Sequence, residues 1–280
     1  MTPEGFLEAV KERLDPYLDG ALPPADAPPE ALHGAMRHLL FPGGKRLRPG
    51  LVVASCEAFG GDRVHAWPAA AAVELLHTYS LVHDDLPCMD DDDERRGRPT
   101  VHVAYGESTA LLAGDALQAQ AFSVLAAAQA PADVVLGATR DLAGAAGSMQ
   151  LVGGQVEDLA FALGGADEEA RVESVHQRKS AALIAASVTM GARFGNAGEA
   201  WLDRLQKFGI EMGIAFQIAD DLLDAEDEDE PCSLVRVLGP QRAAERAESL
   251  LDGALGRIAE LGATAEPLRM LARFAVRRDR

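Results

Sequence analysis

Apolar side chains recur at helical spacing along nearly the whole 280-residue chain, and this periodicity limits the fold more than any other feature. Near the start, Phe6, Val10 and Leu14 lie on one face of a helix that we expect to continue to Leu18. Ala and Leu fill the interiors of the later stretches, and alternating β-branched segments are scarce, so no strand is expected. The sequence therefore predicts an all-α fold, a single large helical bundle over residues 1–280.

Proline and glycine mark the ends of the expected helices. A break at Pro23-Pro24 and Pro28-Pro29 follows the first one, and short Gly, Pro and acidic connections separate the rest. None of these connections resembles a flexible interdomain linker, which favours one domain. After the break we expect helices at Glu30–Leu40, Arg48–Phe59, Trp67–Leu86, Ser108–Ala128, Ala132–Leu151, Glu168–Arg193, Glu199–Asp224, Pro240–Leu261 and Ala265–Arg277.

The net charge of −18 and the pI of about 4.7 argue against general affinity for nucleic acid or anionic membranes. An anionic ligand would need local cations or a bound metal to reverse the sign of the field. We find no signal-peptide pattern and no apolar stretch long and uncharged enough to span a bilayer. The three cysteines are widely spaced, which suits a reducing compartment. We therefore expect a cytoplasmic protein without nucleic-acid partners or stable membrane association.

A cluster of acids follows the apolar stretch Trp67–Val82. Asp84-Asp85 come first, and Asp90–Asp93 follow after Pro87. Proline disfavours helical geometry at Leu86, so the helix should end near the first two acids. Carboxylates at a helix C-terminus meet the negative end of the dipole and repel one another unless water or a cation compensates. One reading of such a run alone is a solvated acidic loop.

Three features favour a metal site instead. The acids directly continue an apolar helix, and Arg95-Arg96 and Arg98 follow at once, which suits a metal together with its anionic ligand. A second apolar helix ends in Asp220-Asp221 and Asp224, where the first and last carboxylates stand at i and i+4 on one face. Hard oxygen ligands of this kind favour Mg²⁺, which bridges to substrate phosphates.

Basic residues supply the other half of the predicted site. Lys45-Arg46 and Arg48 follow a glycine pair, where backbone can approach an anion closely. Alone, this segment also reads as a helix-entry loop with solvated charges. In the same way, His77 also reads as a core histidine, and Gln177–Ser180 as charges at a helix end. The combination is more specific than any of its parts.

These segments resemble the trans-isoprenyl diphosphate synthase family, in particular bacterial farnesyl diphosphate synthases, from about Ala31 to Asp224. The matching segments are Gly43–Pro49, Asp84–Thr100, Gly114–Leu117, Gly153–Gln155 and Gln217–Asp224. The resemblance implies a bundle around a deep central apolar cavity, with the two acidic sites facing each other across its mouth. It also implies a homodimer.

Site roles follow from the resemblance, position by position. It implies that Asp84, Asp90 and Asp220 are the main ligands of Mg²⁺, three ions bound with diphosphate, supported by Asp85, Asp221 and Asp224. It implies that isopentenyl diphosphate is bound by Lys45, Arg48, His77 and Arg96. It implies that the allylic diphosphate is addressed by Arg95, Lys179 and Gln217, which with Asp84, Asp85, Asp90 and Asp220 form the expected catalytic set.

The expected reaction is a head-to-tail condensation. Mg²⁺ and the cations neutralise the departing pyrophosphate, the allylic C–O bond ionises in a dry cavity, and isopentenyl diphosphate attacks before a proton is lost. Tyr79 precedes Asp84 by about 7.5 Å of helical rise. With Ser80 it is the expected chain-length position, an aromatic floor that suits a C15 farnesyl product, with geranylgeranyl and geranyl as alternatives.

The match fails after Asp224. Family members continue there with a Gly-Lys…Asp…Gly-Lys stretch, whereas this chain has the shorter, acidic segment Ala225–Glu230. Loss of those lysines is expected to weaken catalysis. It also keeps open a weakly active or non-catalytic subunit of a heteromeric synthase. A related terpene cyclase is a third reading, against which the basic loop argues, because a cyclase needs no second diphosphate site.

Overall fold

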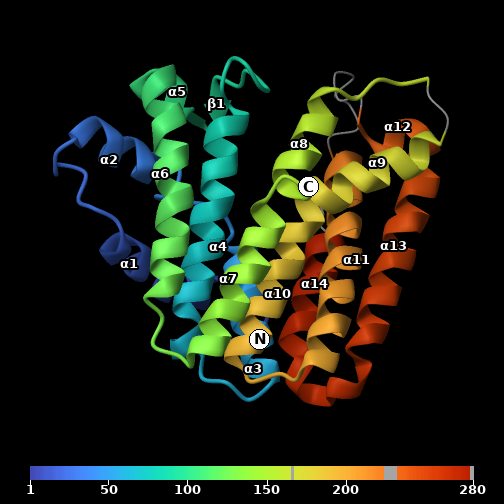
Figure 1. Ribbon diagram of the computed structural model, residues 1–280. Helices are drawn as coiled ribbons and strands as arrows, with labels where there is room; N and C mark the ends of the chain where they lie inside the picture. The colour runs from blue at the N-terminus through green and yellow to red at the C-terminus, as the bar shows by residue number, and fades with distance from the viewer. Residues whose placement is uncertain (165–166, 224–231, 278–280) are drawn as a thin grey trace.

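The computed structural model describes residues 1–164, 167–223 and 232–277, and this part of the chain is almost entirely helical (Figure 1). The earlier helices are α1 (Pro3–Ala21), α2 (Glu30–His38), α3 (Leu47–Ala58), α4 (Arg63–Asp84), α5 (Val101–Tyr105), α6 (Glu107–Ala126) and α7 (Ala132–Ala146). The later ones are α8 (Leu151–Leu159), α9 (Glu168–His176), α10 (Ala182–Phe194), α11 (Glu199–Leu223), α12 (Leu234–Leu238), α13 (Pro240–Arg257) and α14 (Glu266–Val276). The all-α prediction is confirmed.

The core lies around helices α4 and α10. Helix α10 is buried from Ala182 to Ala192 and packs against α3, α7 and α11, while α4 packs against α3, α6 and α10. Figure 1 shows α6 beside α4 at one side of the bundle and α13 beside α11 at the other. Because α4 and α11 both belong to this core, the acids that follow their apolar residues are carried by well-anchored elements.

Small residues let the central helices approach closely. A Cβ on Gly191 of α10 would overlap the carbonyl oxygen of Val52 in α3. A Cβ on Gly209 of α11 would overlap Cα of Ala185 in α10. These contacts fix the spacing of α3, α10 and α11 at a distance that larger side chains would not permit.

Local sequence signals explain where α1 and α4 begin and where α4 ends. Thr2 caps α1 by accepting from the amide of Gly5 at 3.2 Å, with Pro3 in the first turn. Asp62 caps α4 by accepting from Val64 at 2.9 Å. Helix α4 ends at Asp84, as predicted from the proline that follows three residues later.

Two expected helices were wrong in detail, and several elements were not expected. The helix expected over Ala132–Leu151 ends at Ala146, because the backbone becomes extended at Gly147, and α8 begins only at Leu151. The stretch Glu168–Arg193 contains a π-helical turn, Gln177–Ala181, between α9 and α10. A two-residue hairpin pairs β1 (Glu94–Arg95) with β2 (Arg98–Pro99), although no strand was expected. Helices α5, α8 and α12 were not expected either, and the remaining expected boundaries differ from the observed ones by a few residues.

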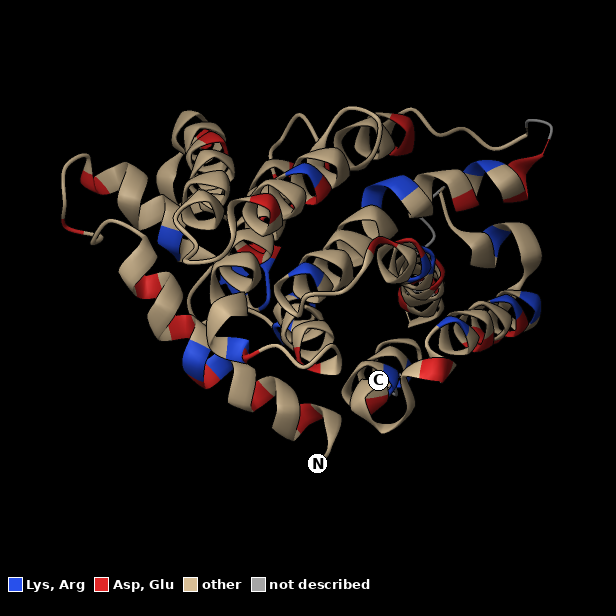
Figure 2. Cartoon of the chain, turned by 60° about the horizontal axis from the view of Figure 1, so that its bottom comes forward, with Lys and Arg blue, Asp and Glu red and all other residues tan. Residues whose placement is uncertain are grey.

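Charge is spread over the outer helices. Figure 2 shows acidic residues recurring along α1, the helix that begins at the N-terminus. No helix in the described part of the chain is long and apolar enough to cross a membrane. The chain has three cysteines, and in the structure all of them are free thiols, Cys88 exposed and the other two buried.

The close approach of α10 to α3 predicts a strong effect of adding one methyl group. We expect Gly191→Ala to lower the free energy of unfolding by about 1–3 kcal/mol, because the new Cβ overlaps backbone that cannot move easily. Gly256→Ala in α13 is the matched control, since nothing lies within 4 Å of its Cβ position. There we expect a gain of about 0.5–1 kcal/mol from the helix propensity of alanine. Urea unfolding of both variants measures the difference, and equal shifts would contradict the packing described.

Candidate active site

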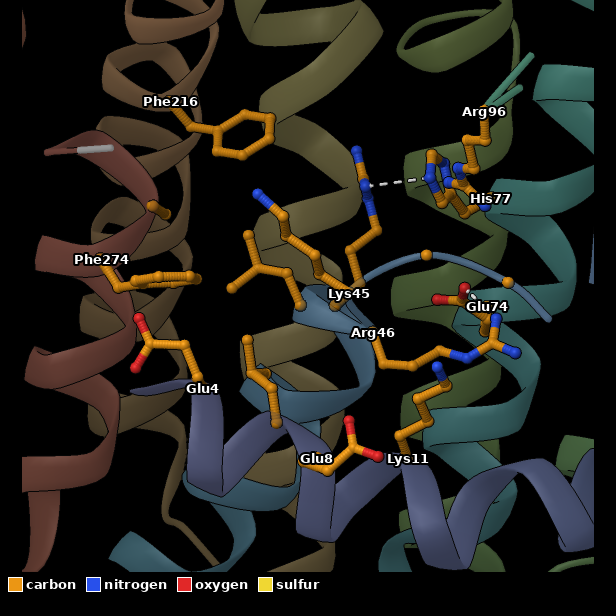
Figure 3. A pocket seen from close by; sticks show the side chains of 16 residues that line it. Glu4, Glu8, Lys11, Lys45, Arg46, Glu74, His77, Arg96, Phe216 and Phe274 are labelled. Carbon is orange, nitrogen blue, oxygen red and sulfur yellow. Dashed lines mark hydrogen bonds and ion pairs between the residues drawn. The ribbon is translucent and has the colours of Figure 1, made fainter. Parts of the chain in front are cut away.

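A pocket of about 710 Å³ opens beside α1, α3, α4, α11 and α14 (Figure 3). It is lined on one side by the basic loop 43–48 and on the other by Phe216 of α11 and Phe274 of α14, while α1 contributes Leu7 and the charged side chains of Glu4, Glu8 and Lys11. The four side chains predicted to bind isopentenyl diphosphate all line this pocket, namely Lys45, Arg48, His77 and Arg96. Three separate segments of the chain therefore contribute cations or a histidine to one space.

Glycines let two guanidinium groups lie directly against the basic loop. Gly43 has a φ of 65°, and a Cβ there would overlap the guanidinium of Arg46. A Cβ on Gly44 would lie 2.8 Å from Nη2 of Arg96. The glycine pair is thus required by side chains that pack over it.

Arg96 reaches the pocket from the tip of the hairpin. Arg96 and Gly97 have φ values of 56° and 73°, the left-handed pair that a tight two-residue turn requires. Arg98 donates to the carbonyl oxygens of His38 at 3.1 Å and Phe41 at 2.8 Å. These bonds tie the hairpin to the segment that leads into the basic loop.

His77 faces this pocket as a neutral imidazole. Burial lowers its pKa well below 6.5, and the nearby guanidinium groups of Arg48 and Arg96 lower it further. Nη1 of Arg48 donates to Nε2 of His77 at 3.3 Å. Because arginine is only a donor, Nε2 must accept, which leaves the proton on Nδ1. The ring can therefore donate a hydrogen bond to an anion without carrying a charge.

Two carboxylates are withdrawn from solvent at the end of α4. Burial raises the pKa of Asp84 to about 7, Lys179 opposes this, and Asp90 adds to it. Asp85 is fully buried, and its Oδ1 accepts from Nε of Arg95 at 2.6 Å. The other oxygen, Oδ2, has no hydrogen-bond partner in the part of the chain that the structure describes. A solvated acidic loop does not describe these two side chains, although Asp90 and its successors are exposed.

Lys179 is directed at this acidic cluster from the π-helical turn. Burial lowers its pKa, but Asp158 of α8, followed by Asp84 and Asp90, outweighs this effect and raises it. Lys179 forms an ion pair with Asp158, a residue that the sequence reasoning missed. No local sequence signal identifies it, because Asp158 meets Lys179 only where Gly154, four residues earlier on the same face of α8, packs against the backbone of Lys179.

The two described acids of the second site differ in their surroundings. Asp220 lies close enough to Arg48 to affect its pKa. Asp221 is buried, and its carboxylate accepts from the amide of Leu234 at 3.1 Å and from Nε2 of Gln217 at 3.2 Å. The predicted supporting ligand Asp224 lies outside the described residues. Asp221 thus anchors the start of α12 to the end of α11.

The predicted allylic-site residue Gln217 is held from both ends. Its Oε1 accepts from the hydroxyl of Ser180 at 2.7 Å, while its amide nitrogen donates to Asp221. Ser180 belongs to the same π-helical turn as Lys179. This turn therefore orients two of the residues predicted to address one diphosphate.

The predicted chain-length residues lie on α4 below Asp84. Tyr79 is buried, and its ring packs edge-on against His83 with centroids 5.6 Å apart. The hydroxyl of Ser80 donates to the carbonyl oxygen of His77 at 2.9 Å, so it is occupied within its own helix. The roles of both residues remain predictions.

The donor chemistry at the end of α4 fits a hard divalent cation. Asp84 is half-buried with a raised pKa, and one oxygen of Asp85 is buried without a hydrogen-bond partner among the described residues. Carboxylate oxygens are the ligands that Mg²⁺ prefers. Within the described ranges, no three His, Cys, Asp or Glu side chains lie close enough together to hold an ion by themselves. Bound diphosphate would have to supply further oxygen ligands, as is common for Mg²⁺.

The neutral state of His77 predicts a pH-dependent stability difference. Below about pH 6.5 the unfolded chain binds a proton at this side chain that the folded chain does not. The wild type should therefore lose more unfolding free energy than His77→Gln between pH 7.5 and 5.5, with a limiting slope of about 1.4 kcal/mol per pH unit. Urea unfolding at both pH values measures this. An equal loss in the two proteins, or a smaller one in the wild type, would show that the ring is not held neutral.

Known proteins share both the sequence and the fold. The family model described as polyprenyl synthetase matches residues 29–233. The chain is 45% identical over 227 residues to the chloroplastic heterodimeric geranylgeranyl pyrophosphate synthase large subunit 1 of Arabidopsis thaliana, a match over 78% of this chain and 60% of that protein. It is 41% identical over 268 residues to a chloroplastic geranylgeranyl pyrophosphate synthase of Catharanthus roseus, over 90% of this chain and 75% of that one.

Solved structures agree over almost the full described length. An apo FPP/GFPP synthase from Zymomonas mobilis has a TM-score of 0.91 and 39% identity, with 98% of each chain covered. A geranyltransferase from Helicobacter pylori, solved with magnesium and isoprenyl diphosphate, has a TM-score of 0.86 and 31% identity, with 99% of each chain covered. Sequence motifs, helical architecture and these matches lead to one conclusion. The chain belongs to the polyprenyl synthetase family.

Proposed function

We propose that this chain is a Mg²⁺-dependent, short-chain prenyltransferase that condenses isopentenyl diphosphate head to tail with dimethylallyl or geranyl diphosphate and releases pyrophosphate. The observation that carries the proposal is that one pocket is lined by all four predicted donors, Lys45, Arg48, His77 and Arg96. In a chain with a net charge of −18, such a local gathering of donors is what an anionic substrate requires.

The pocket suits a ligand with one anionic and one apolar end. Figure 3 shows Lys45 projecting between Phe216 and Phe274 on one side and His77 and Arg96 on the other. A diphosphate would lie among the cations, where the guanidinium group of Arg48 or Arg96 can bind two of its oxygens at once. A short isopentenyl chain would contact the aromatic side.

The allylic diphosphate would lie at the end of α4. Asp84 and Asp90, supported by Asp85, would hold Mg²⁺ from one side, and Asp220, supported by Asp221 and Asp224, from the other. A bound Mg²⁺ supplies positive charge to the departing pyrophosphate oxygens. Arg95, Lys179 and Gln217 would bind the same group.

Lys179 must change partners for this to happen. In the structure it pairs with Asp158, and Asp84 and Asp90 also stabilise its charge. An arriving diphosphate offers a more highly charged partner to the same ammonium group. The apolar cavity that the family resemblance implies would then exclude water, so that the ionised allylic carbon reacts with the isopentenyl double bond and not with solvent.

We propose farnesyl diphosphate as the main product. An aromatic Tyr79 beneath the first acidic site supports a short chain, whereas two of the relatives are named geranylgeranyl synthases. A C20 product is therefore the alternative. Cytoplasmic location remains an expectation, and the plant relatives carry the word chloroplastic in their names.

We also propose a homodimer. Apart from Met1 and Val64, the exposed large hydrophobic side chains of the described residues all lie between residues 103 and 163. They belong mainly to α5, α6, α7 and α8, of which α5 packs against α6, α6 against α7 and α7 against α8. An apolar concentration of this kind is typical of a protein interface.

Elongation of a defined substrate tests the function directly. With Mg²⁺ and isopentenyl diphosphate, the purified protein should extend dimethylallyl and geranyl diphosphate. Asp84→Asn should lower kcat by about 100-fold or more, because about 3 kcal/mol of charge stabilisation is lost. Asp91→Asn is the matched control, because Asp91 is an exposed acid of the same run. Its backbone has a left-handed φ of 57°, which asparagine also adopts readily.

Three outcomes distinguish the readings. Elongation that depends on Asp84 and not on Asp91 supports the proposal. A folded protein that elongates no allylic substrate would move the assignment to a non-catalytic subunit, a reading that the acidic segment after Asp224 keeps open. Cyclic hydrocarbon products formed without isopentenyl diphosphate would indicate a cyclase.

Product length tests the role of Tyr79. Tyr79→Ala should shift the products from C15 towards C20 and longer, because the truncated side chain opens space along α4. Tyr79→Phe keeps the ring and should leave the distribution unchanged. Chromatography of the dephosphorylated products measures both variants. An unaltered distribution in Tyr79→Ala would exclude this side chain as the floor.

A further inference from the structure

We propose that Arg46 sets the affinity for isopentenyl diphosphate without touching it, by holding the basic loop and by keeping Glu74 away from the substrate-binding cations. This inference rests on the proposed function of the pocket. Of the three cations in the basic loop, Lys45 and Arg48 have proposed substrate roles and Arg46 has none. Its surroundings indicate a positioning role.

The guanidinium of Arg46 is completely buried and joins three parts of the chain. Nη1 donates to Glu74 of α4 at 2.6 Å, and Nε donates to Asp15 of α1 at 3.0 Å. Nη2 donates to the carbonyl oxygen of Leu40, which lies after α2, at 2.7 Å. The side chain of Arg46 is 0% exposed, that of Glu74 5% and that of Asp15 24%. A planar fork with several donors suits such a three-way connection.

Arg46 and its neighbour Lys45 point in different directions. Lys45 is exposed, and its ammonium nitrogen lies 6.0 Å from the centroid of the Phe274 ring. Figure 3 shows Lys45 reaching into the pocket while Arg46 turns towards Glu74. Arg46 also has a left-handed φ of 55° immediately before α3, an unfavourable conformation for an arginine. The contacts of its side chain hold the loop in that conformation.

Glu74 gives this arrangement a second consequence. Its carboxylate is buried and lines the pocket, and it acts electrostatically on Arg48 and Arg96 as well as on Arg46. Nη1 of Arg46 donates a hydrogen bond to Oε1 of Glu74 at 2.6 Å and so pairs with this carboxylate. Without that partner, the buried carboxylate would pair with Arg48 or Arg96, because a buried charge seeks a counter-charge. It would then compete with the diphosphate for the same donors.

The two variants Arg46→Gln and Arg46→Gln/Glu74→Gln separate these effects. We expect Arg46→Gln to weaken binding of isopentenyl diphosphate about tenfold or more and to raise its KM similarly. The KM for geranyl diphosphate should change by less than about twofold, since Arg95, Lys179 and Gln217 are untouched. The double variant should recover much of the lost affinity, because the competing carboxylate has been removed.

Calorimetric titration with isopentenyl diphosphate gives the affinity independently of turnover. If the wild type binds but does not elongate, the proposed function fails while the role of Arg46 is still measured. A purely structural role would lower Tm and weaken both substrates together, without recovery in the double variant. Either that result, or unchanged affinity in Arg46→Gln, would overturn the inference.

A milder pair of variants applies if Arg46→Gln does not fold. Asp15→Asn removes one partner at the partly exposed edge of the network and should weaken isopentenyl diphosphate binding about two- to threefold. Asp19→Asn is its matched control on the same helix, since Asp19 pairs with Arg37 away from the pocket. Equal affinities in these two variants would also overturn the inference.

Discussion

Like charges gathered at the buried end of a helix are the constraint on which the rest of this structure depends. Asp84 and Asp85 follow the apolar residues of α4, so burial disfavours their ionised form, and the helix dipole adds to this. Lys179 and Arg95 compensate only part of that charge, since burial still outweighs them for both carboxylates. A site built in this way gains stability when more positive charge arrives.

The packing of the helices gives this electrostatic arrangement its precision. Glycines in α10 and α11 bring the central helices close together, and Gly154 brings α8 against the π-helical turn that carries Lys179. The basic pocket is fixed in a comparable way, because Arg98 ties the hairpin to the chain before the basic loop. Substrate-binding groups therefore come from rigid elements and from short, tethered turns.

Much of this organisation was predictable from the sequence, for physical reasons. Helical period, the proline and glycine breaks, and Pro87 located most helices and the end of α4. The convergence of Lys45, Arg48, His77 and Arg96 in one pocket was also expected, through the family resemblance.

Other features depend on contacts between distant segments and could not be read locally. Asp158 becomes important only because α8 packs on the turn of Lys179. The inward direction of Asp221 depends on Leu234, which lies beyond an acidic segment that the sequence could not place. The hairpin was missed because two-residue strands leave no period to detect. The sequence grouped Arg46 with Lys45 and Arg48 as one basic segment, and its separate role depends on buried contacts with Asp15, Leu40 and Glu74.

The central claim is that the two acidic helix ends form one cation site around a diphosphate. Anomalous diffraction from crystals grown with Mn²⁺ in place of Mg²⁺, and with pyrophosphate, tests it most directly. We expect manganese peaks between pyrophosphate and the carboxylates of Asp84 and Asp90, and a further peak beside Asp220. Pyrophosphate bound with no metal at either helix end, or manganese found only at exposed acids elsewhere, would contradict this account.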